Sequence, residues 1–136
     1  MVPALIYLSP MDKRKIMQAK RLLEEFPEKR IGIRRLSRMV TTNENKVKQG
    51  FKYLLGTSPG AYSKKVRMTR AMQLLSEKKI SIQEVAEECG YRDRQNFSIA
   101  FKKYWGNTPG YYKSLGASGN YLSSASSIRR ISFSLM

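Results

Sequence analysis

The 136-residue chain carries a formal net charge of +16, from 26 Lys and Arg residues against 10 Asp and Glu residues. A surplus of this size indicates a polyanionic partner, a nucleic acid or an anionic membrane face, or else simply a soluble basic protein. There is no histidine and one cysteine, Cys89, which excludes an internal disulfide, histidine-based catalysis and the usual zinc sites. We therefore expect that the protein is not an enzyme and has no metal site and no cofactor. The lack of a disulfide suits a reducing compartment.

The chain opens with an apolar run over residues 2–8, VPALIYL. This run is far shorter than the roughly 20 residues that a membrane-spanning helix needs. It has neither the basic region nor the cleavage pattern of a signal peptide, so we expect no membrane partner. We interpret residues 1–10 as an N-terminal stub or linker, either belonging to a removed upstream region or forming a frayed terminus.

Helical periodicity dominates the rest of the chain, and the sustained alternation of strands is absent. Seven helical segments are expected within residues 9–26, 31–40, 43–55, 59–77, 80–90, 93–105 and 108–114. Asn43 and Asp93 are typical N-cap residues, and Gly56 is a typical helix end. The fourth segment would be roughly 28 Å long at about 1.5 Å per residue.

The second half of this pattern repeats the first. IRRLSRMVTTNENKVKQGFKYLLGTSPGAY (33–62) aligns with IQEVAEECGYRDRQNFSIAFKKYWGNTPGYY (82–112) once one residue is added in the second turn. Apolar residues match at each inward position: Ile33 with Ile82, Leu36 with Val85, Val40 with Cys89, Val47 with Phe97, and Phe51 with Phe101. Each copy reads as helix, tight turn and helix. It is either a helix-turn-helix that reads DNA or a helical hairpin used only for packing.

The fourth helix favours the DNA-reading interpretation. Two recognition helices on one chain read the same face of DNA only if they stand about 34–36 Å apart, one helical turn. A rod of about 28 Å with its flanking turns has the right order of length. RNA is disfavoured because the A-form major groove is too narrow for a helix. The alternative function is a nonspecific basic nucleic-acid-binding module.

Two sequence stretches carry a specific family resemblance. FKYLLGTSPGAYSKKVRMTRAMQLL (51–75) and ISIQEVAEECGYRDRQNFSIAFKKYWGNTPGYYK (80–113) resemble the AraC/XylS family of bacterial transcription regulators. The motifs are Arg-Met-x-x-Ala-x-x-Leu-Leu, then Gly-Tyr…Phe-x-x-x-Phe-Lys-Lys…Gly-x-Thr-Pro. The resemblance implies an all-α, homeodomain-like fold of about seven helices. It also implies a cytoplasmic, nucleoid-associated activator whose partners are double-stranded DNA and RNA polymerase.

The resemblance also implies a domain organisation. A first helix-turn-helix subdomain would cover residues 11–57, a linker helix 58–78, and a second helix-turn-helix subdomain 79–115. Residues 116–136, rich in Ser and small residues, are interpreted as a disordered tail. The N-terminal ligand-binding and dimerisation domain of many members has no counterpart here. The chain is thus either a short free-standing regulator or a fragment, and a monomer unless an upstream dimerisation domain is missing.

Two residues depart from the family pattern. Thr41 stands where the family often has the turn glycine that this chain has as Gly90. Either the first turn is tighter, therefore, or Asn43 takes the positive-φ role. Ile99 stands where some members have a base-contacting Arg.

Base contacts are expected from the outward face at the start of each recognition helix. The predicted base-contacting residues are those opposite the inward Val and Phe positions: Asn45, Lys48, Gln49, Arg94, Gln95 and Ser98. Asn and Gln pair well with adenine, whereas Lys and Arg pair with guanine. Similarity to the family puts base contacts at the same positions. The alternative is an ordinary solvated helix face.

Phosphate contacts are expected from basic residues near these helices. The predicted set is Arg34, Arg35, Lys46, Lys64, Lys65, Lys102 and Lys103. Charge is uneven, because residues 29–70 contain twelve Lys and Arg against the single acid Glu44, whereas residues 80–103 contain four of each sign. We hypothesise that the first unit supplies most of the nonspecific electrostatic binding to DNA, and that binding by the second unit depends on base readout and shape fit.

Several other residues have both a structural and a binding interpretation. Arg67 either binds a phosphate or braces the linker helix against the first unit, and we favour the structural role. The aromatic residues Tyr104, Trp105, Tyr111 and Tyr112 either stack on bases or pack in the core and its rim. Their positions at a helix end and in a short helix favour packing.

Overall fold

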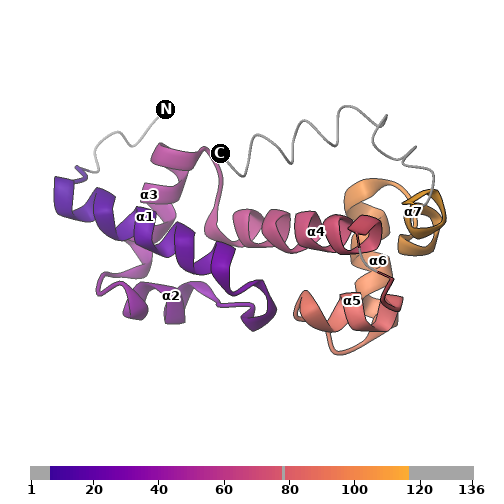
Figure 1. The fold of residues 1–136 in the computed structure, drawn as a ribbon. Helices are drawn as coiled ribbons and strands as arrows, with labels where there is room; N and C mark the ends of the chain where they lie inside the picture. Colours follow the sequence, from indigo (N-terminus) through magenta and orange to yellow (C-terminus); the bar gives the residue numbers. More distant parts are fainter. Residues whose placement is uncertain (1–6, 78, 117–136) are drawn as a thin grey trace. The chain divides into compact units, whose positions relative to one another are not determined.

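The computed structural model describes residues 7–77 and 79–116, and these form seven α-helices, one short 3₁₀-helix and no strand (Figure 1). The elements are α1 (Pro10–Glu25), η1 (Pro27–Lys29), α2 (Ile33–Met39), α3 (Glu44–Leu55), α4 (Pro59–Glu77), α5 (Ile82–Glu88), α6 (Arg94–Trp105) and α7 (Pro109–Gly116). The predicted all-α fold is confirmed. The predicted tail beyond residue 116, and the first six residues of the predicted stub, lie outside the described residues.

The chain divides into two compact units, Met1–Lys65 and Val66–Met136. The division falls inside α4, so each unit contains part of this continuous helix. The first unit contains α1, α2 and α3, and the second contains α5, α6 and α7. Each unit therefore includes one of the two predicted helix-turn-helix pairs.

Side-chain N-caps, most of them predictable from the sequence, fix where the helices begin. Asn43 accepts a hydrogen bond from the Lys46 N–H at the start of α3, and Asp93 accepts one from the Gln95 N–H at the start of α6. Both predicted N-caps are thus confirmed. Gly56 ends α3 with φ 73°, a left-handed conformation that suits glycine.

The core of the first unit lies between α1, α2 and α3. Its buried side chains include Ile16, Ala19, Leu23, Leu36, Val47 and Phe51. At the crossing of α1 and α3, a Cβ built on Gly50 would lie 2.5 Å from Cδ1 and Cγ1 of Ile16. Because no real Cβ tolerates such a distance, the glycine permits the close approach of α1 to the recognition helix.

The core of the second unit is rich in aromatic rings. Phe97 and Phe101 of α6 are fully buried, and Phe101 lies 5.8 Å from Tyr112 and 6.4 Å from Trp105 between ring centres. The Trp105 indole donates to the Met68 carbonyl at 3.1 Å. The packing interpretation of Trp105 and Tyr112 is therefore confirmed.

Arg67 is also buried in the second unit. Its side chain is 7% exposed, and its guanidinium lies 5.9 Å from the centre of the Tyr91 ring. A buried guanidinium on an aromatic face stabilises packing and is poorly available to a DNA phosphate. This contact favours a structural role over phosphate binding, but it is made within the second unit, whereas the expected bracing was against the first unit.

The turn between α2 and α3 corrects one sequence-based alternative. Thr41 itself has φ 60°, matching φ 85° at the aligned Gly90 between α5 and α6. Asn43 has φ −110°, so the expectation that Asn43 takes the positive-φ role is wrong. An N-cap residue must be extended for its side chain to reach back to the helix, and the left-handed step therefore falls on Thr41.

Candidate nucleic-acid interface

The predicted base-contacting residues of the first unit lie on the solvent side of α3. Val47 and Phe51 are fully buried, which turns the opposite face of the helix outward. Asn45 and Lys48 are exposed, and Gln49 is half-buried. The helix thus presents an amide, an ammonium and a second amide along its first two turns, groups that suit hydrogen bonds to base edges.

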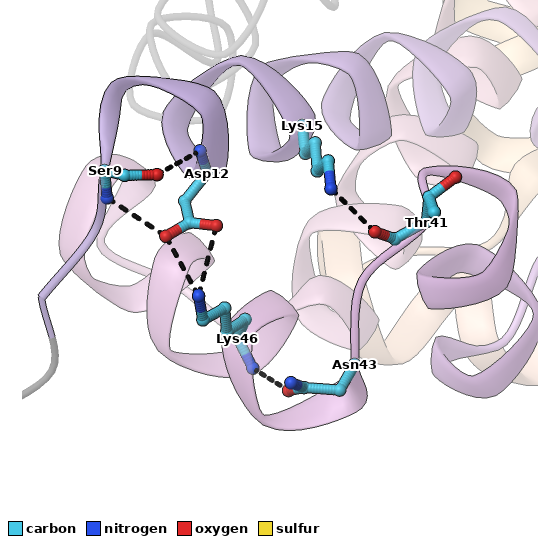
Figure 2. A network of polar contacts seen from close by, with 6 residues as sticks. All are labelled: Ser9, Asp12, Lys15, Thr41, Asn43 and Lys46. Atoms are coloured by element: carbon cyan, nitrogen blue, oxygen red, sulfur yellow. Dashed lines mark hydrogen bonds and ion pairs between the residues drawn. The ribbon is translucent and has the colours of Figure 1, made fainter.

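The start of α3 is tied to α1 by a polar network (Figure 2). The Lys46 ammonium lies 3.0 and 3.2 Å from the two carboxylate oxygens of Asp12. Asp12 also accepts from the Ser9 N–H, completing the capping box of α1. The Ser9 N–H and the Lys46 ammonium together hold the pKa of Asp12 below its ordinary value of 3.8. One carboxylate therefore joins the N-terminal ends of two helices.

A second lysine holds the turn before the recognition helix. The Lys15 ammonium donates to the Thr41 carbonyl at 2.8 Å (Figure 2). This bond fixes the carbonyl of the one non-glycine left-handed residue in the α2–α3 turn. Sequence reasoning missed Lys15 and Asp12, because their partners lie 26 and 34 positions away and no local pattern links them.

The predicted phosphate contacts of the first unit differ in their availability. Arg34 and Arg35 are exposed on α2, where Arg34 Nε lies 3.6 Å from a Glu44 carboxylate oxygen. Lys64 and Lys65 are half-buried at the start of α4. Lys46 is also half-buried, and its charge is already paired with Asp12.

The second recognition helix presents its predicted residues in the same manner. Phe97 and Phe101 face the core, and Arg94 and Gln95 are exposed beside the Asp93 cap. Ser98 is half-buried one turn further on. The predicted phosphate contacts Lys102 and Lys103 are exposed towards the C-terminal end of α6. All six predicted base-contacting residues are therefore at least partly accessible to solvent.

One residue on the outward side of α6 is apolar. Ile99 is 61% exposed, whereas Phe97 and Phe101 of the same helix are fully buried. Sequence reasoning noted its departure from the family pattern but assigned it no contact. The internal repeat is the signal that could have found it, because Ile99 aligns with the predicted base reader Gln49.

Other kinds of site have little support in the described residues. Among residues 7–77 and 79–116, no helix is both long and apolar enough to cross a bilayer. The same residues contain no cluster of three or more His, Cys, Asp or Glu side chains that could hold a metal ion. Burial raises the pKa of Cys89 to about 12, so this thiol is unreactive at neutral pH.

Comparisons with known proteins agree on one family. A family model described as a helix-turn-helix domain matches residues 36–114. The transcriptional regulator GbdR of Pseudomonas aeruginosa is 33% identical over 95 residues, which cover 70% of this chain and 26% of GbdR. The transcriptional activator RhaR of Escherichia coli is 29% identical over 75 residues, covering 55% of this chain and 27% of RhaR. The chain thus spans about a quarter of the length of these curated relatives.

Solved structures give the same result. An AraC-type regulator from Chromobacterium violaceum matches with a TM-score of 0.70 and 26% identity, over 78% of this chain and 95% of that one. The DNA-binding domain of AdpA, solved with a target DNA, matches with a TM-score of 0.71 over 78% of this chain and 96% of that one. At 20% identity the AdpA match supports the fold alone. The matched proteins are transcription regulators rather than enzymes, which agrees with the sequence-based expectation.

Proposed function

The chain belongs to the AraC/XylS family of helix-turn-helix transcription regulators, and we propose that it reads a specific DNA site with two recognition helices. In this proposal α3 and α6 enter adjacent major-groove segments of one duplex. The observation that carries the proposal is the duplication: two capped helices bury equivalent apolar residues and leave the equivalent faces, polar except for Ile99, in solvent.

The helix α4 supports the two-segment reading. It runs for 19 residues from Pro59 to Glu77, about 28 Å at about 1.5 Å per residue. Half-sites on one face of DNA are separated by about 34–36 Å, so a helix of this length with its flanking turns is a suitable spacer. We propose that α4 sets the separation of the two recognition helices on DNA.

Residue roles follow from exposure and chemistry. We assign base contacts to Asn45, Lys48, Gln49, Arg94, Gln95 and Ser98. We assign backbone contacts to Arg34, Arg35, Lys46, Lys64, Lys65, Lys102 and Lys103. Arg94 is suited to a guanine, and its loss would cost about 1–3 kcal/mol and relax specificity at one position. Lys46 would share its charge between a phosphate and Asp12.

Selection of bound sequences from a random DNA pool, followed by footprinting with the full chain, tests this proposal. We expect an asymmetric site with two protected segments one helical turn apart, preferred at least about 10³-fold over random DNA at physiological salt. Gln95→Ala and Asn45→Ala should each relax specificity in one segment only. Gln18→Ala, on an exposed position of α1, serves as the control. A single protected half-turn contradicts the two-helix reading, and equal affinity for all sequences leaves only a nonspecific nucleic-acid binder.

The proposed division of labour between the units has its own test. Each lost phosphate contact should reduce the slope of log affinity against log salt by about 0.9. Single alanine variants of the assigned backbone contacts should give a larger summed reduction for the five in the first unit than for the two in the second. Equal totals would contradict the hypothesis that the first unit supplies most of the nonspecific electrostatic binding to DNA.

The regulatory outcome is a further part of the proposal. We infer a bacterial, cytoplasmic and nucleoid-associated activator that contacts RNA polymerase, and the similarity to the transcriptional activator RhaR supports this direction. Transcription in vitro from a promoter carrying the selected site should rise when the chain is added. A fall would identify a repressor. Sedimentation of the chain alone tests the expectation that it is a monomer.

A further inference from the structure

We propose that Ile99 reads a thymine, through contact of its side chain with the 5-methyl group in the major-groove segment that α6 enters. The inference rests on the proposed function, because it assigns one further contact within the same interface. It makes the second unit selective for an A·T pair at one position without any hydrogen bond from this residue.

The position of Ile99 on α6 is the first observation. Its side chain is 61% exposed, although isoleucine is among the residues most often buried. Gln95 precedes it by one turn and Lys103 follows it by one turn, and both are exposed. Residues four apart share one face of a helix, so Ile99 lies in the middle of the face opposite the buried rings.

The internal repeat is the second observation. The buried pairs Val47 with Phe97 and Phe51 with Phe101 set the alignment of the two recognition helices. In that alignment Ile99 occupies the position of Gln49, which we assign to base readout. The second unit therefore has, at a base-reading position, a side chain with no donor and no acceptor.

The chemistry of the major groove selects the ligand. Among the base edges exposed there, the 5-methyl of thymine is the one apolar group, and the others are hydrogen-bond donors and acceptors. Contact with Ile99 would remove two apolar surfaces from water at once. The amino group of a cytosine in the same place would instead lose its hydration without gaining a partner. Isoleucine thus favours thymine and disfavours cytosine.

Replacement of thymidine by deoxyuridine tests the proposed methyl contact directly, since thymine and uracil differ only by the 5-methyl group. Within the selected site, each thymine of the α6 segment is exchanged singly for deoxyuridine and binding to the full chain is measured. We expect one exchange to weaken binding about fourfold, equivalent to about 0.8 kcal/mol for one buried methyl group. The other exchanges should have little effect.

Variants of the protein identify which residue contacts that methyl group. Ile99→Ala should abolish the uracil penalty at the sensitive position, and Ile99→Val should retain most of it. Gln49→Ala, the equivalent position in the first unit, should lower affinity yet preserve the penalty. Thermal melts of Ile99→Ala should match the wild type, because the side chain is largely solvent-exposed.

The outcomes separate this inference from the proposed function. Three results would overturn the inference about Ile99 while leaving the proposed function intact. They are specific binding without any uracil penalty, a penalty that is unchanged in Ile99→Ala, and a selected site that has no thymine in the α6 segment. Failure to select any preferred site overturns both proposals. A penalty that disappears with Ile99→Ala and survives Gln49→Ala supports the inference.

Discussion

The two units hold their recognition helices by different means. In the first, α1 crosses α3 at Gly50, and the Asp12–Lys46 ion pair ties the N-terminal ends of both helices together. In the second, the position equivalent to Gly50 is Ala100, and α6 is held by tilted and edge-to-face aromatic rings around Phe101. The first unit depends on close backbone approach and polar contacts, and the second on side-chain volume.

One helix-turn-helix backbone can therefore be packed in more than one way. The inward positions need only be filled, so Val47 in one copy and Phe97 in the other are equally well buried. The exposed faces are then free to diverge, because no core contact constrains them. Variants at equivalent positions of the two units should expose how far the two packing solutions differ.

The largest effect is expected from truncating the aromatic core. Phe101→Ala should lower the free energy of unfolding by about 3–5 kcal/mol, because it removes a fully buried ring from contact with Phe97, Trp105 and Tyr112. Urea unfolding followed by circular dichroism and by the fluorescence of Trp105, the only tryptophan, measures the loss in the second unit. Phe51→Ala is the matched variant of the first unit, where the ring has one aromatic neighbour among the described residues, Tyr62, at 6.1 Å between ring centres. A larger loss for Phe51→Ala would contradict the comparison.

The next effect comes from adding one methyl group at the crossing of α1 and α3. Gly50→Ala should destabilise the first unit by about 1–3 kcal/mol, because the new Cβ would overlap Ile16. In an ordinary helix the same change would stabilise by up to about 1 kcal/mol, so the sign of the measured change is decisive. Chemical denaturation gives that sign.

A double variant supplies the control for Gly50. Ile16→Ala removes the two atoms, Cδ1 and Cγ1, that would lie 2.5 Å from a Cβ at position 50, so Gly50→Ala should cost much less in that background. Ala100→Gly in the second unit should cost only about 0.5–1 kcal/mol, the usual effect of glycine inside a helix. Strict additivity of Gly50→Ala and Ile16→Ala would rule out the proposed close contact.

The two turns should respond in opposite directions to exchange of their residues. Gly90→Thr forces a β-branched residue into φ 85° and should cost about 1–3 kcal/mol. Thr41→Gly relieves the same strain at φ 60° and should stabilise by less than about 1 kcal/mol, since glycine gains entropy in the unfolded chain. The Lys15 bond survives because it is made to the backbone carbonyl. Thermal melts measure both shifts, and a destabilised Thr41→Gly would argue against strain in the first turn.

The smallest effect concerns pH. The pKa of Asp12 is lowered by the Ser9 N–H and by Lys46, so ionised Asp12 stabilises the fold above its ordinary pKa of 3.8. That contribution is lost as pH falls from 3.8 through the lower folded pKa of Asp12. Asp12→Asn should therefore flatten the acid side of the stability profile, measured as urea midpoints against pH.

The second unit offers the matched variant for Asp12. Glu84 occupies the same capping-box position after Ser81, and hydrogen bonds from Ser81 lower its pKa below 4.5. Within residues 7–77 and 79–116, Glu84 forms no ion pair like that of Asp12 with Lys46. The charge of Lys113 also lowers the pKa of Glu84, but less than the hydrogen bonds from Ser81 do. Glu84→Gln should flatten the profile less than Asp12→Asn. An equal or larger change would mean that the backbone caps dominate both carboxylates.

Local sequence signals predicted most of the fold. The caps Asn43 and Asp93, the helix end at Gly56 and the inward pairs Val47 with Phe97 were all readable from residue type and spacing. The solvent side of each recognition helix followed, because a helix that buries one stripe must expose the opposite one. Contact of those residues with DNA stays a prediction.

The helices, the duplication and the family could be predicted from the amino-acid sequence, since these depend on patterns within a few turns of chain. The contacts between distant segments are visible only in the folded chain: Asp12 against Lys46, Lys15 against the Thr41 carbonyl, and Ile16 over Gly50. The folded chain also has the left-handed step at Thr41 rather than Asn43. The physical reason is that such contacts arise from the packing of α1 on α3, which no local preference of either helix specifies.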